Sequence, residues 1–343
     1  MLDEIREQPD ALERTLLAER NSIEQLRTVL TRDRPRLIML AARGTSDNAA
    51  QFGRYLLEIT TGIPVTLAAP SIFTLYKASF QFDGVLVIAI SQSGESTDTN
   101  LVLERAREQG ARTIGVTNEA SSTLARIAEH PFLVHARREQ SVAATKTYTG
   151  QMLMLYLLAY ALGGKISLDD LARLPEWANH ALGLETEIAR AAERYRFMDH
   201  AVVVGRGLNY ANAFEFALKL METCYVIAER FSSADLLHGP IAMVEASFPA
   251  FLFTPSGVTW PGLREMFEKL GQLKAETLLI TDQSNPEAPA LSKHAIVLPV
   301  SLDEIFTPIP YIIPAQLFAA SLAMEKGLNP DEPRTISKVT RTM

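Results

Sequence analysis

The sequence is poor in the residues that stabilise secreted and metal-dependent proteins. Its 343 residues include a single cysteine, Cys224, so neither an intrachain disulfide nor a multi-cysteine metal site can form. The six histidines are scattered, and none stands in an H-E-x-x-H or similar spacing typical of a metal site. We therefore expect no metal, no cofactor and a reducing, cytoplasmic location.

Segments that would export or anchor the chain are also missing. The N-terminal stretch MLDEIREQPDALERTL is charged and helical in pattern, unlike a signal peptide. The longest apolar run, QMLMLYLLAYALGG, is too short to span a bilayer and predicts a buried core helix. The formal net charge of -7 argues against a nucleic-acid partner, because binding to a phosphate backbone needs a basic face. We expect neither a membrane nor a nucleic-acid partner.

The familiar nucleotide-binding motifs are absent. The sequence has no G-x-x-x-x-G-K-[ST], and GRGLNYANA at 205–213 carries only the first two glycines of G-x-G-x-x-G. A dinucleotide is therefore not expected.

What the sequence does have is a regular alternation of two patterns. Short apolar, β-prone runs alternate with helical patterns, which indicates parallel sheets covered by helices on both faces. The alternation restarts after a polar helical stretch at 167–196, so we predict an α/β fold of two tandem doubly wound units. The predicted strands are 36–40, 64–68, 85–90, 112–117 and 131–136, then 201–205, 250–254, 276–281 and 295–300; long helices are predicted near 144–162 and 306–326.

These patterns also predict a domain organisation. We expect an N-terminal helical segment at 1–29, a first domain at 30–165 and a helical connector at 166–196. A second domain would follow at 197–330, and then a C-terminal tail at 331–343.

Two strand-to-helix junctions of the first half are rich in hydroxyl groups. They are AARGTSDNAAQFGRYL after the first strand and SQSGESTDT, residues 91–99, after the third. Backbone N–H groups at a helix N-terminus carry partial positive charge and bind phosphate without a lysine. The pair predicts a binding site for a small anion such as a sugar phosphate. The alternative is that Ser93 or Ser96 simply caps its helix.

The second half contains a charged stripe on an otherwise apolar helix. Glu215, Lys219 and Glu222 are spaced i, i+4, i+7 and so line one side, facing a cleft or polar interior; the alternative is an ordinary surface ion pair. His238 follows in LLHGP, although a lone histidine is more often structural than catalytic. Without a metal or nucleotide, these groups suit proton transfer on a sugar.

The motifs as a set are similar to one family. The chain resembles the sugar isomerase (SIS) family, in particular the isomerase half of glucosamine-6-phosphate synthases, over nearly its whole length after about residue 30. The resemblance rests on motifs that occur in the family's order: RGTSDNAA, SQSGESTDT, EQSVAATKTYTGQ, EFALKLMETCYVIAE, LLHGP and PRTISKVT.

The resemblance implies a set of binding residues. The sugar phosphate would be held by Thr45, Ser46, Ser91, Gln92, Ser93 and Ser96, and Val142 would line the sugar site through its backbone. The family usually has threonine at the place of Ser96, so the hydroxyl is retained.

It also implies catalytic roles. Glu222 would move a proton between C1 and C2, with Lys219 and Glu215 as its helical neighbours. His238, contributed by the partner subunit in such dimers, would open the sugar ring, and Lys338 would touch, or form an imine with, the open-chain sugar. Without the PRTISK match, Lys338 would be read as an ordinary solvated lysine. A homodimer with shared active sites follows from the same resemblance.

The sequence has no counterpart of the synthase's glutaminase domain, whose nucleophile is an N-terminal cysteine. We therefore expect a glucosamine-6-phosphate deaminase that releases ammonia and fructose 6-phosphate, with one site per subunit. The alternatives are a fructosamine-6-phosphate deglycase with a larger leaving amine, an ammonia-dependent synthase or isomerase, and a non-catalytic sugar-phosphate sensor. Retention of Glu222, His238 and Lys338 argues against the sensor.

Overall fold

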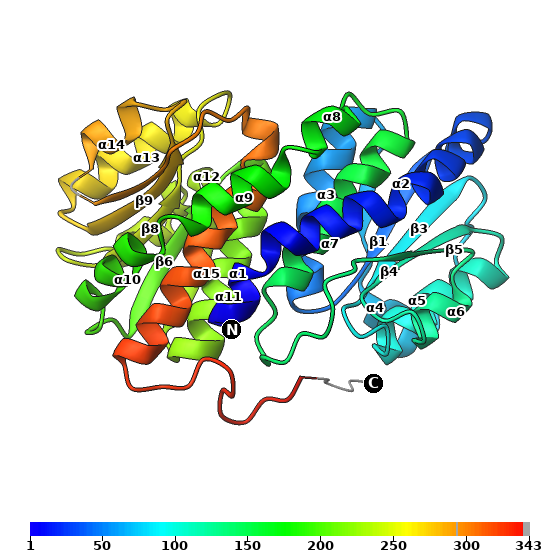
Figure 1. The fold of residues 1–343 in the computed structure, drawn as a ribbon, viewed down its shortest axis with the longest axis horizontal. Helices are drawn as coiled ribbons and strands as arrows, with labels where there is room; N and C mark the ends of the chain where they lie inside the picture. Colours follow the sequence, from blue (N-terminus) through cyan, green and yellow to red (C-terminus); the bar gives the residue numbers. More distant parts are fainter. Residues whose placement is uncertain (293, 339–343) are drawn as a thin grey trace. The chain divides into compact units, whose positions relative to one another are not determined.

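The computed structural model describes residues 1–292 and 294–338 and divides the chain into two compact units (Figure 1). The N-terminal unit comprises Glu7–Gln140, Ala144–Pro175 and, from the tail, residues 336–338. The C-terminal unit comprises Met1–Arg6, Ser141–Ala143 and Glu176–Thr335. Residues 339–343 of the predicted tail lie outside the described residues.

The N-terminal unit is built on a five-stranded sheet in the order β2-β1-β3-β4-β5, in which every pairing is parallel. Helices α4, α5 and α6 pack together on one face, while α2, α3 and α7 form the other group (Figure 1). The strands are β1 (Leu37–Ala41), β2 (Val65–Leu67), β3 (Val85–Ile90), β4 (Arg112–Thr117) and β5 (His130–Leu133). The helices are α2 (Gln8–Arg32), α3 (Thr45–Thr61), α4 (Pro70–Thr74), α5 (Thr97–Glu108), α6 (Thr123–Ile127), α7 (Lys146–Ala161) and α8 (Leu168–Leu171).

The C-terminal unit repeats the plan with a second all-parallel sheet in the order β10-β9-β8-β6-β7. Its strands are β6 (His200–Gly205), β7 (Ile227–Ser232), β8 (Pro249–Phe253), β9 (Glu276–Asp282) and β10 (Ala295–Leu298). Its helical elements are α1 (Leu2–Arg6), α10 (Glu185–Arg194), η1 (Gly207–Asn209), α11 (Tyr210–Cys224), α12 (Ser233–Leu237), η2 (Pro240–Met243), α13 (Trp260–Gln272), α14 (Glu287–Leu291), η3 (Glu304–Phe306) and α15 (Pro308–Glu325); the chain passes from one unit to the other within α9 (Leu174–Leu182). The predicted fold class, two doubly wound α/β units, is confirmed.

Burial on both faces explains why the strands read as unbroken apolar runs. All six residues of β3 are buried, and alternate ones, Val85, Val87 and Ala89, join a core cluster under α4, α5 and α6. Strand residues point alternately to opposite faces, so a sheet covered twice needs apolar side chains at every position. Helix α7 is buried along nearly its entire length, as its apolar sequence predicts.

One strand escaped the sequence patterns. Strand β7, with the sequence IAERFS, is not among the predicted strands, but it pairs in parallel with β6. It is the edge strand of its sheet, and Glu229 and Arg230 are exposed on it. Edge strands commonly carry charge, which hides the apolar run that marks the central strands.

The described helices include none that combines the length and the apolar character needed to cross a membrane.

The core of the C-terminal unit yields a prediction about stability. The Phe251 ring lies 5.1 Å from those of Phe216 and Phe318 and 5.2 Å from that of Tyr195, measured between centroids. We expect Phe251→Ala to cost about 3–5 kcal/mol, because truncation removes buried area and leaves a cavity. Phe197→Ala is the matched control, since Phe197 also stacks on Tyr195 but is 61% exposed. Urea unfolding of the two variants checks this; equal losses would contradict the packing described.

Candidate functional site

The two hydroxyl-rich junctions lie side by side in the N-terminal unit. One follows β1 and leads into α3, and the other follows β3 and leads into α5. Strands β1 and β3 are neighbours in parallel register, and the strand order reverses between them. Ligands of open parallel sheets bind at such a reversal, beyond the carboxyl ends of the strands. We call residues 43–46 and 91–96 the anion cradle.

The second half of the anion cradle is a tight turn fixed by Gly94. Gly94 has a φ of +65°, and its N–H donates to the carbonyl and hydroxyl oxygens of Ser91, at 3.2 and 3.1 Å. Its carbonyl accepts from the Asn100 side chain and from the Leu124 N–H, each at 3.0 Å. The turn is therefore held from β3, α5 and α6 together.

The helices that begin at the anion cradle are not capped by the hydroxyls beside them. Gly44, at the start of α3, has no side chain that could cap the helix. In the described residues the Ser96 side chain makes no capping hydrogen bond at the start of α5. Instead, the Ser96 hydroxyl lies 3.0 Å from that of Thr99. The capping alternative for Ser96 is therefore wrong. Because helix amino ends favour negative charge, an anion bound at this edge would lie near the starts of α3 and α5.

Other predicted binding residues differ in burial. Ser46 and Ser91 are buried, whereas Thr45, Gln92 and Ser93 are half-buried. The Ser46 hydroxyl accepts a 3.0 Å hydrogen bond from the Gln151 amide of α7, which fixes its position. The Ser93 hydroxyl accepts from the Glu95 N–H at 3.3 Å, within the turn.

An ion pair that joins the two junctions was not foreseen. Arg43 follows β1, and its guanidinium bonds the buried Asp98 carboxylate of α5 at 2.8 Å. Arg43 also acts on Asp47: burial raises the pKa of the Asp47 carboxyl, and the Arg43 charge opposes that rise. The signal was in the sequence, since Arg43 opens the RGTSDNAA motif, but sequence does not reveal its partner.

In the C-terminal unit, the charged stripe of α11 is a compact triad. The Lys219 ammonium lies 2.6 Å from Glu222 Oε2 and 3.3 Å from Glu215 Oε1. The side chains of Lys219 and Glu215 are buried, whereas that of Glu222 is 25% exposed. The stripe is thus not an ordinary surface pair: a buried cation is shared by two carboxylates, and Glu222 is the one that faces outward.

The charge state of the triad follows from these contacts. Burial alone would lower the pKa of Lys219, but the carboxylates of Glu215 and Glu222 raise it above its ordinary value. Lys219 therefore stays protonated across the neutral range. Because the folded pKa is raised, its stabilising contribution is lost only when pH climbs through that raised value.

Two further predicted residues, His238 and Val142, also lie in the C-terminal unit. His238 follows α12, and its side chain is exposed. Val142 is half-buried, and its N–H donates to the Asp331 carbonyl at 3.1 Å.

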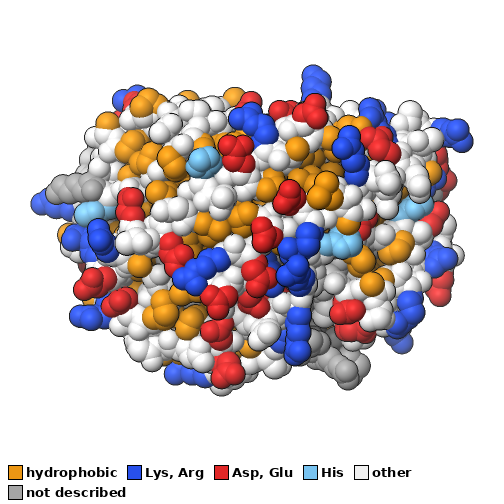
Figure 2. Space-filling view, viewed as in Figure 1, with side chains coloured by type: hydrophobic (Ala, Val, Ile, Leu, Met, Phe, Trp, Pro, Cys, Tyr) orange, Lys and Arg blue, Asp and Glu red, His pale blue; other side chains and the backbone are white. Residues whose placement is uncertain are grey.

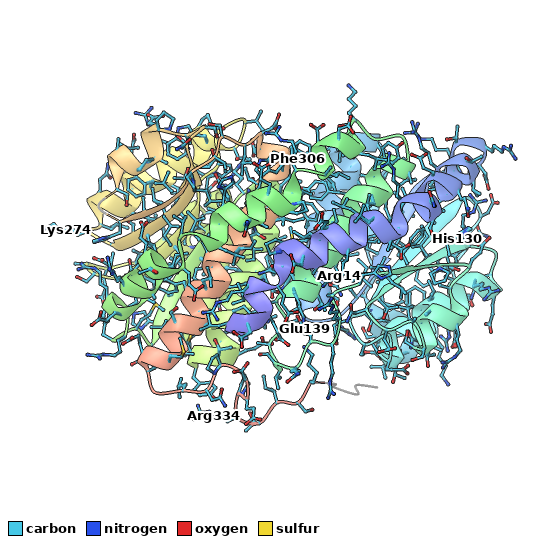
Figure 3. All side chains as sticks on the ribbon, in the orientation of Figure 1. Arg14, His130, Glu139, Lys274, Phe306 and Arg334 are labelled. Atoms are coloured by element: carbon cyan, nitrogen blue, oxygen red, sulfur yellow. The ribbon has the colours of Figure 1, made fainter. Side chains whose placement is uncertain are left out.

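The predicted tail lysine is paired within the N-terminal unit. The Lys338 ammonium lies 2.7 Å from Glu139 Oε2, and the Glu139 side chain is fully buried. Figure 3 labels Glu139 on the segment that leads into α7. Glu139 belongs to the EQSVAATK motif, but it could not be singled out from the sequence, because its partner is 199 residues away.

The corresponding turn of the C-terminal unit already contains a carboxylate. Thr259, at the start of α13, donates its hydroxyl proton to Glu304 Oε1. A β-carbon at Gly257 would overlap the same Glu304 carboxylate. The hydroxyls of Ser256 and Ser284 bond each other at 2.7 Å. The chain's own Glu304 carboxylate therefore occupies the position in this unit that corresponds to the anion cradle of the other unit.

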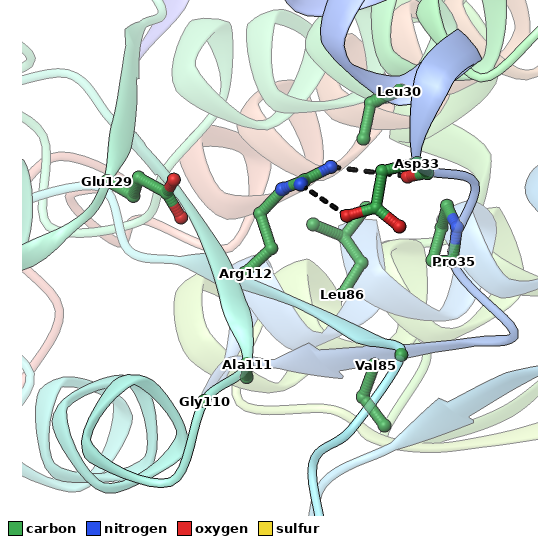
Figure 4. A pocket seen from close by; sticks show the side chains of 10 residues that line it. Leu30, Asp33, Pro35, Val85, Leu86, Gly110, Ala111, Arg112 and Glu129 are labelled. Atoms are coloured by element: carbon green, nitrogen blue, oxygen red, sulfur yellow. Dashed lines mark hydrogen bonds and ion pairs between the residues drawn. The ribbon is translucent and has the colours of Figure 1, made fainter.

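A separate cavity lies at the opposite edge of the N-terminal sheet. It measures about 210 Å³ and is bordered by the amino ends of β3 and β4 (Figure 4). Arg112 and Asp33, which line it, bond each other at 2.6 Å. Because its charged groups are already paired and it lies away from the carboxyl edge, we do not assign it to the site.

Among the described residues, neither the surface charge nor the side chains that could bind a metal identify another site. On the face seen in Figure 2, Lys and Arg side chains are interspersed with Asp and Glu. Among the described residues, no group of three or more His, Cys, Asp or Glu side chains could hold a metal ion. Cys224 is buried, and burial raises the pKa of its thiol to about 11, so it is a poor nucleophile.

Comparisons with known proteins agree with this architecture. The family model described as SIS domain matches residues 33–161 and 196–326. The glutamine–fructose-6-phosphate aminotransferase [isomerizing] of Pyrococcus horikoshii is 35% identical over 346 residues, covering 98% of this chain and 57% of that protein. The chain thus spans little more than half the length of the curated relatives it matches.

Solved structures show the same fold. The C-terminal domain of glucosamine-fructose-6-phosphate aminotransferase from Francisella tularensis superposes with a TM-score of 0.87 at 28% identity, covering 97% of this chain and 98% of that one. Glucosamine-6-phosphate deaminase from Thermotoga maritima superposes with a TM-score of 0.77 at 23% identity, covering 99% of both chains. The second likeness concerns the fold alone.

The Gly94 turn can be tested against a second glycine with similar backbone geometry. Gly62 also has a positive φ, +71°, but a β-carbon there meets no atom within 4 Å, whereas at Gly94 it would lie 2.9 Å from Thr117 Oγ1 and closer still to Ser122. We expect Gly62→Ala to cost about 1–2 kcal/mol from backbone strain. Gly94→Ala should cost a further ~1–3 kcal/mol from overlap.

The same pair of variants separates stability from binding. We expect Gly94→Ala to weaken fructose 6-phosphate binding by at least about tenfold, or 1.4 kcal/mol, and Gly62→Ala to leave it unchanged. Isothermal titration calorimetry measures both. Equal affinities in the two variants would show that the 91–96 turn does not hold the ligand.

Proposed function

Because this chain belongs to the SIS-domain family, we propose that it is an enzyme acting on a sugar phosphate, and specifically that it deaminates glucosamine 6-phosphate. The observation that carries the proposal is the α11 triad, in which a buried ammonium holds two carboxylates and only Glu222 faces outward. A binding protein for sugar phosphates needs the anion cradle but has no use for such a group.

The anion cradle supplies the binding step of the proposal. The amino ends of α3 and α5 lie at the anion cradle, and the Ser91, Ser93 and Ser96 hydroxyls belong to the turn that leads into α5. A phosphate monoester fits this donor set, because aligned backbone N–H groups favour negative charge without a fixed cation. We propose one such site per chain, since Glu304 fills the corresponding turn of the other unit.

The chemical step is a proton transfer between neighbouring carbons. We propose that His238 assists ring opening, which leaves an aldehyde at C1 and an amine at C2. Glu222 then removes the proton from C2 and returns it to C1, giving a C2 imine with a hydroxyl at C1. Water adds to the imine, ammonia leaves, and fructose 6-phosphate remains. The sum is glucosamine 6-phosphate and water converted to fructose 6-phosphate and ammonia.

The charge of Lys219 bears on this step. The Lys219 ammonium lies 2.6 Å from Glu222 Oε2 and so fixes the position of the carboxylate that would carry the proton. The transfer also needs donors that stabilise the enolic intermediate. We propose that Lys338, and through it the tail, provides one of them.

The direction of the reaction distinguishes this proposal from the chain's relatives. Several relatives are named as aminotransferases that take nitrogen from glutamine. The cysteine of this sequence is buried and its Sγ bonds the Ala319 carbonyl, so it is not a candidate for glutamine hydrolysis. Supplied with the amino sugar alone, the chain should therefore run towards ammonia release.

The decisive experiment incubates the purified chain with glucosamine 6-phosphate in the absence of glutamine. We expect ammonia and fructose 6-phosphate in equal amounts, measured by coupled enzymatic assays. If fructoselysine 6-phosphate is turned over instead, the chain is a deglycase with a larger leaving amine. If the reverse reaction with added ammonia dominates, it is a synthase. Binding without turnover of any of these sugars would identify a sensor.

A second experiment tests the proton carrier. Glu222→Gln keeps a hydrogen-bond acceptor for Lys219 but removes the base, so we expect kcat to fall by about 10²–10⁴-fold with little change in ligand affinity. Glu268→Gln is the control: Glu268 bonds Arg264 at 3.1 Å in an exposed helical pair of the same unit. Full turnover by Glu222→Gln would assign the proton transfer to another group.

A further inference from the structure

Glu139 is a buried carboxylate with an unusual set of partners. It accepts hydrogen bonds from the Thr145 N–H at 2.9 Å, the Thr147 N–H at 3.2 Å and the Thr147 hydroxyl at 2.8 Å. These donors form the first turn of α7, which starts at Lys146. Glu139 therefore caps α7 from outside the helix, where a negative charge also complements the helix dipole.

The remaining partner is the ammonium of Lys338, 2.7 Å from Glu139 Oε2. Burial alone would raise the pKa of Glu139, but the Lys338 charge, its hydrogen bond and those from Thr145 and Thr147 lower it below its ordinary value. The carboxylate is thus ionised at neutral pH. Because the folded pKa is lowered, this stabilisation is present above the ordinary pKa of a glutamate and is lost as pH falls through the lowered value.

The described part of the tail has no regular structure of its own. Residues 328–338 form neither helix nor strand, so backbone hydrogen bonds of a helix or sheet do not fix Lys338. A lysine side chain on such a segment loses up to about 2 kcal/mol of rotamer entropy when it is held in one place. A rigid counter-charge is what can hold it, and Glu139 is rigid because α7 fixes it.

The position of this pair is informative. Glu139 lies on the segment that leaves β5, and the 91–96 turn leaves β3 in the same parallel sheet. The carboxyl ends of parallel strands share one edge, which is where ligands of such sheets bind. The pair therefore brings the tail amine to the edge that carries the anion cradle.

From these observations we propose that Glu139 is a positioning residue that seats the Lys338 amine at the N-terminus of α7 for its contact with the open-chain sugar. The inference rests on the proposed function, because it assigns Glu139 a role through Lys338. It predicts that Glu139 matters to turnover only while Lys338 is present. A merely structural cap would matter equally with or without the lysine.

The chain provides a matched control. Glu7 bonds the buried Lys146 ammonium at 2.7 Å, so it too is a carboxylate that pairs with a lysine at the start of α7. The partner of the Glu7 carboxylate is Lys146 rather than Lys338. Glu7→Gln therefore removes an ion pair from the same helix end without touching Lys338.

The test is a double-mutant cycle of Glu139→Gln and Lys338→Met, read out as kcat for glucosamine 6-phosphate. We expect Glu139→Gln to lower kcat by about tenfold or more, in line with the loss of positioning, while the Kd for fructose 6-phosphate stays unchanged. In the Lys338→Met background the same change should cost nothing further, and Glu7→Gln should retain full turnover. Equal losses in both backgrounds would overturn the proposal.

A second readout does not need activity. Acylation of Lys338 by an N-hydroxysuccinimide ester, measured by mass spectrometry relative to the exposed Lys165, reports whether the amine is seated. We expect Glu139→Gln to raise labelling of Lys338 several-fold and Glu7→Gln to leave it unchanged; no rise would overturn the seating. If the wild-type chain turns over no sugar but this labelling pattern holds, the proposed function fails while the seating stands.

A conservative variant, Glu139→Asp, serves as a control for effects on stability. Glutamine at 139 can still accept from the Thr145 N–H, but it loses the charge. Glu139→Asp keeps the charge and withdraws it by one methylene, so we expect it to protect Lys338 from acylation better than Glu139→Gln and to recover part of the rate. Loss of protection as large as in Glu139→Gln would contradict a role for the charge.

Discussion

The 91–96 turn depends on a single backbone conformation. Gly94 must adopt a positive φ and lie against Ser122 without a β-carbon, so that its N–H and C=O can bond β3, α5 and α6 at once. The Ser96 side chain makes no capping hydrogen bond at the start of α5. The phosphate site that we propose would therefore depend on the amino end of α5, which this turn holds in place.

The two units share a topology but differ at the turn after β3 and at the corresponding turn after β8. In the N-terminal unit the turn after β3 is left open, whereas in the C-terminal unit Glu304 places its own carboxylate against Gly257 and Thr259. A negative side chain in that position satisfies the helix N-terminus much as a bound anion does. Duplication of the fold therefore does not imply duplication of the site, and the C-terminal unit contributes a different feature, the charged stripe of α11.

Much of the fold could be predicted because strands buried on both faces appear in the sequence as apolar runs. Strands such as β3 and β6 are covered on both faces and read as apolar runs, while the edge strand β7 carries Glu229 and Arg230 and was not predicted as a strand. The α11 stripe was also legible, since i, i+4, i+7 spacing is local. The Arg43–Asp98 and Glu139–Lys338 pairs were not, because their partners are 55 and 199 residues apart and only the folded chain brings them together.

The two units surround their buried charges with opposite sets of partners. In α11 one ammonium is shared by two carboxylates, which keeps Lys219 protonated, and Glu222 is partly exposed. At the start of α7 one carboxylate is shared by an ammonium and three neutral donors, which keeps Glu139 ionised and buried. A carboxylate that must accept a proton needs access, and one that must hold an amine in place needs rigidity. The difference in burial between Glu222 and Glu139 matches the division of roles that we propose.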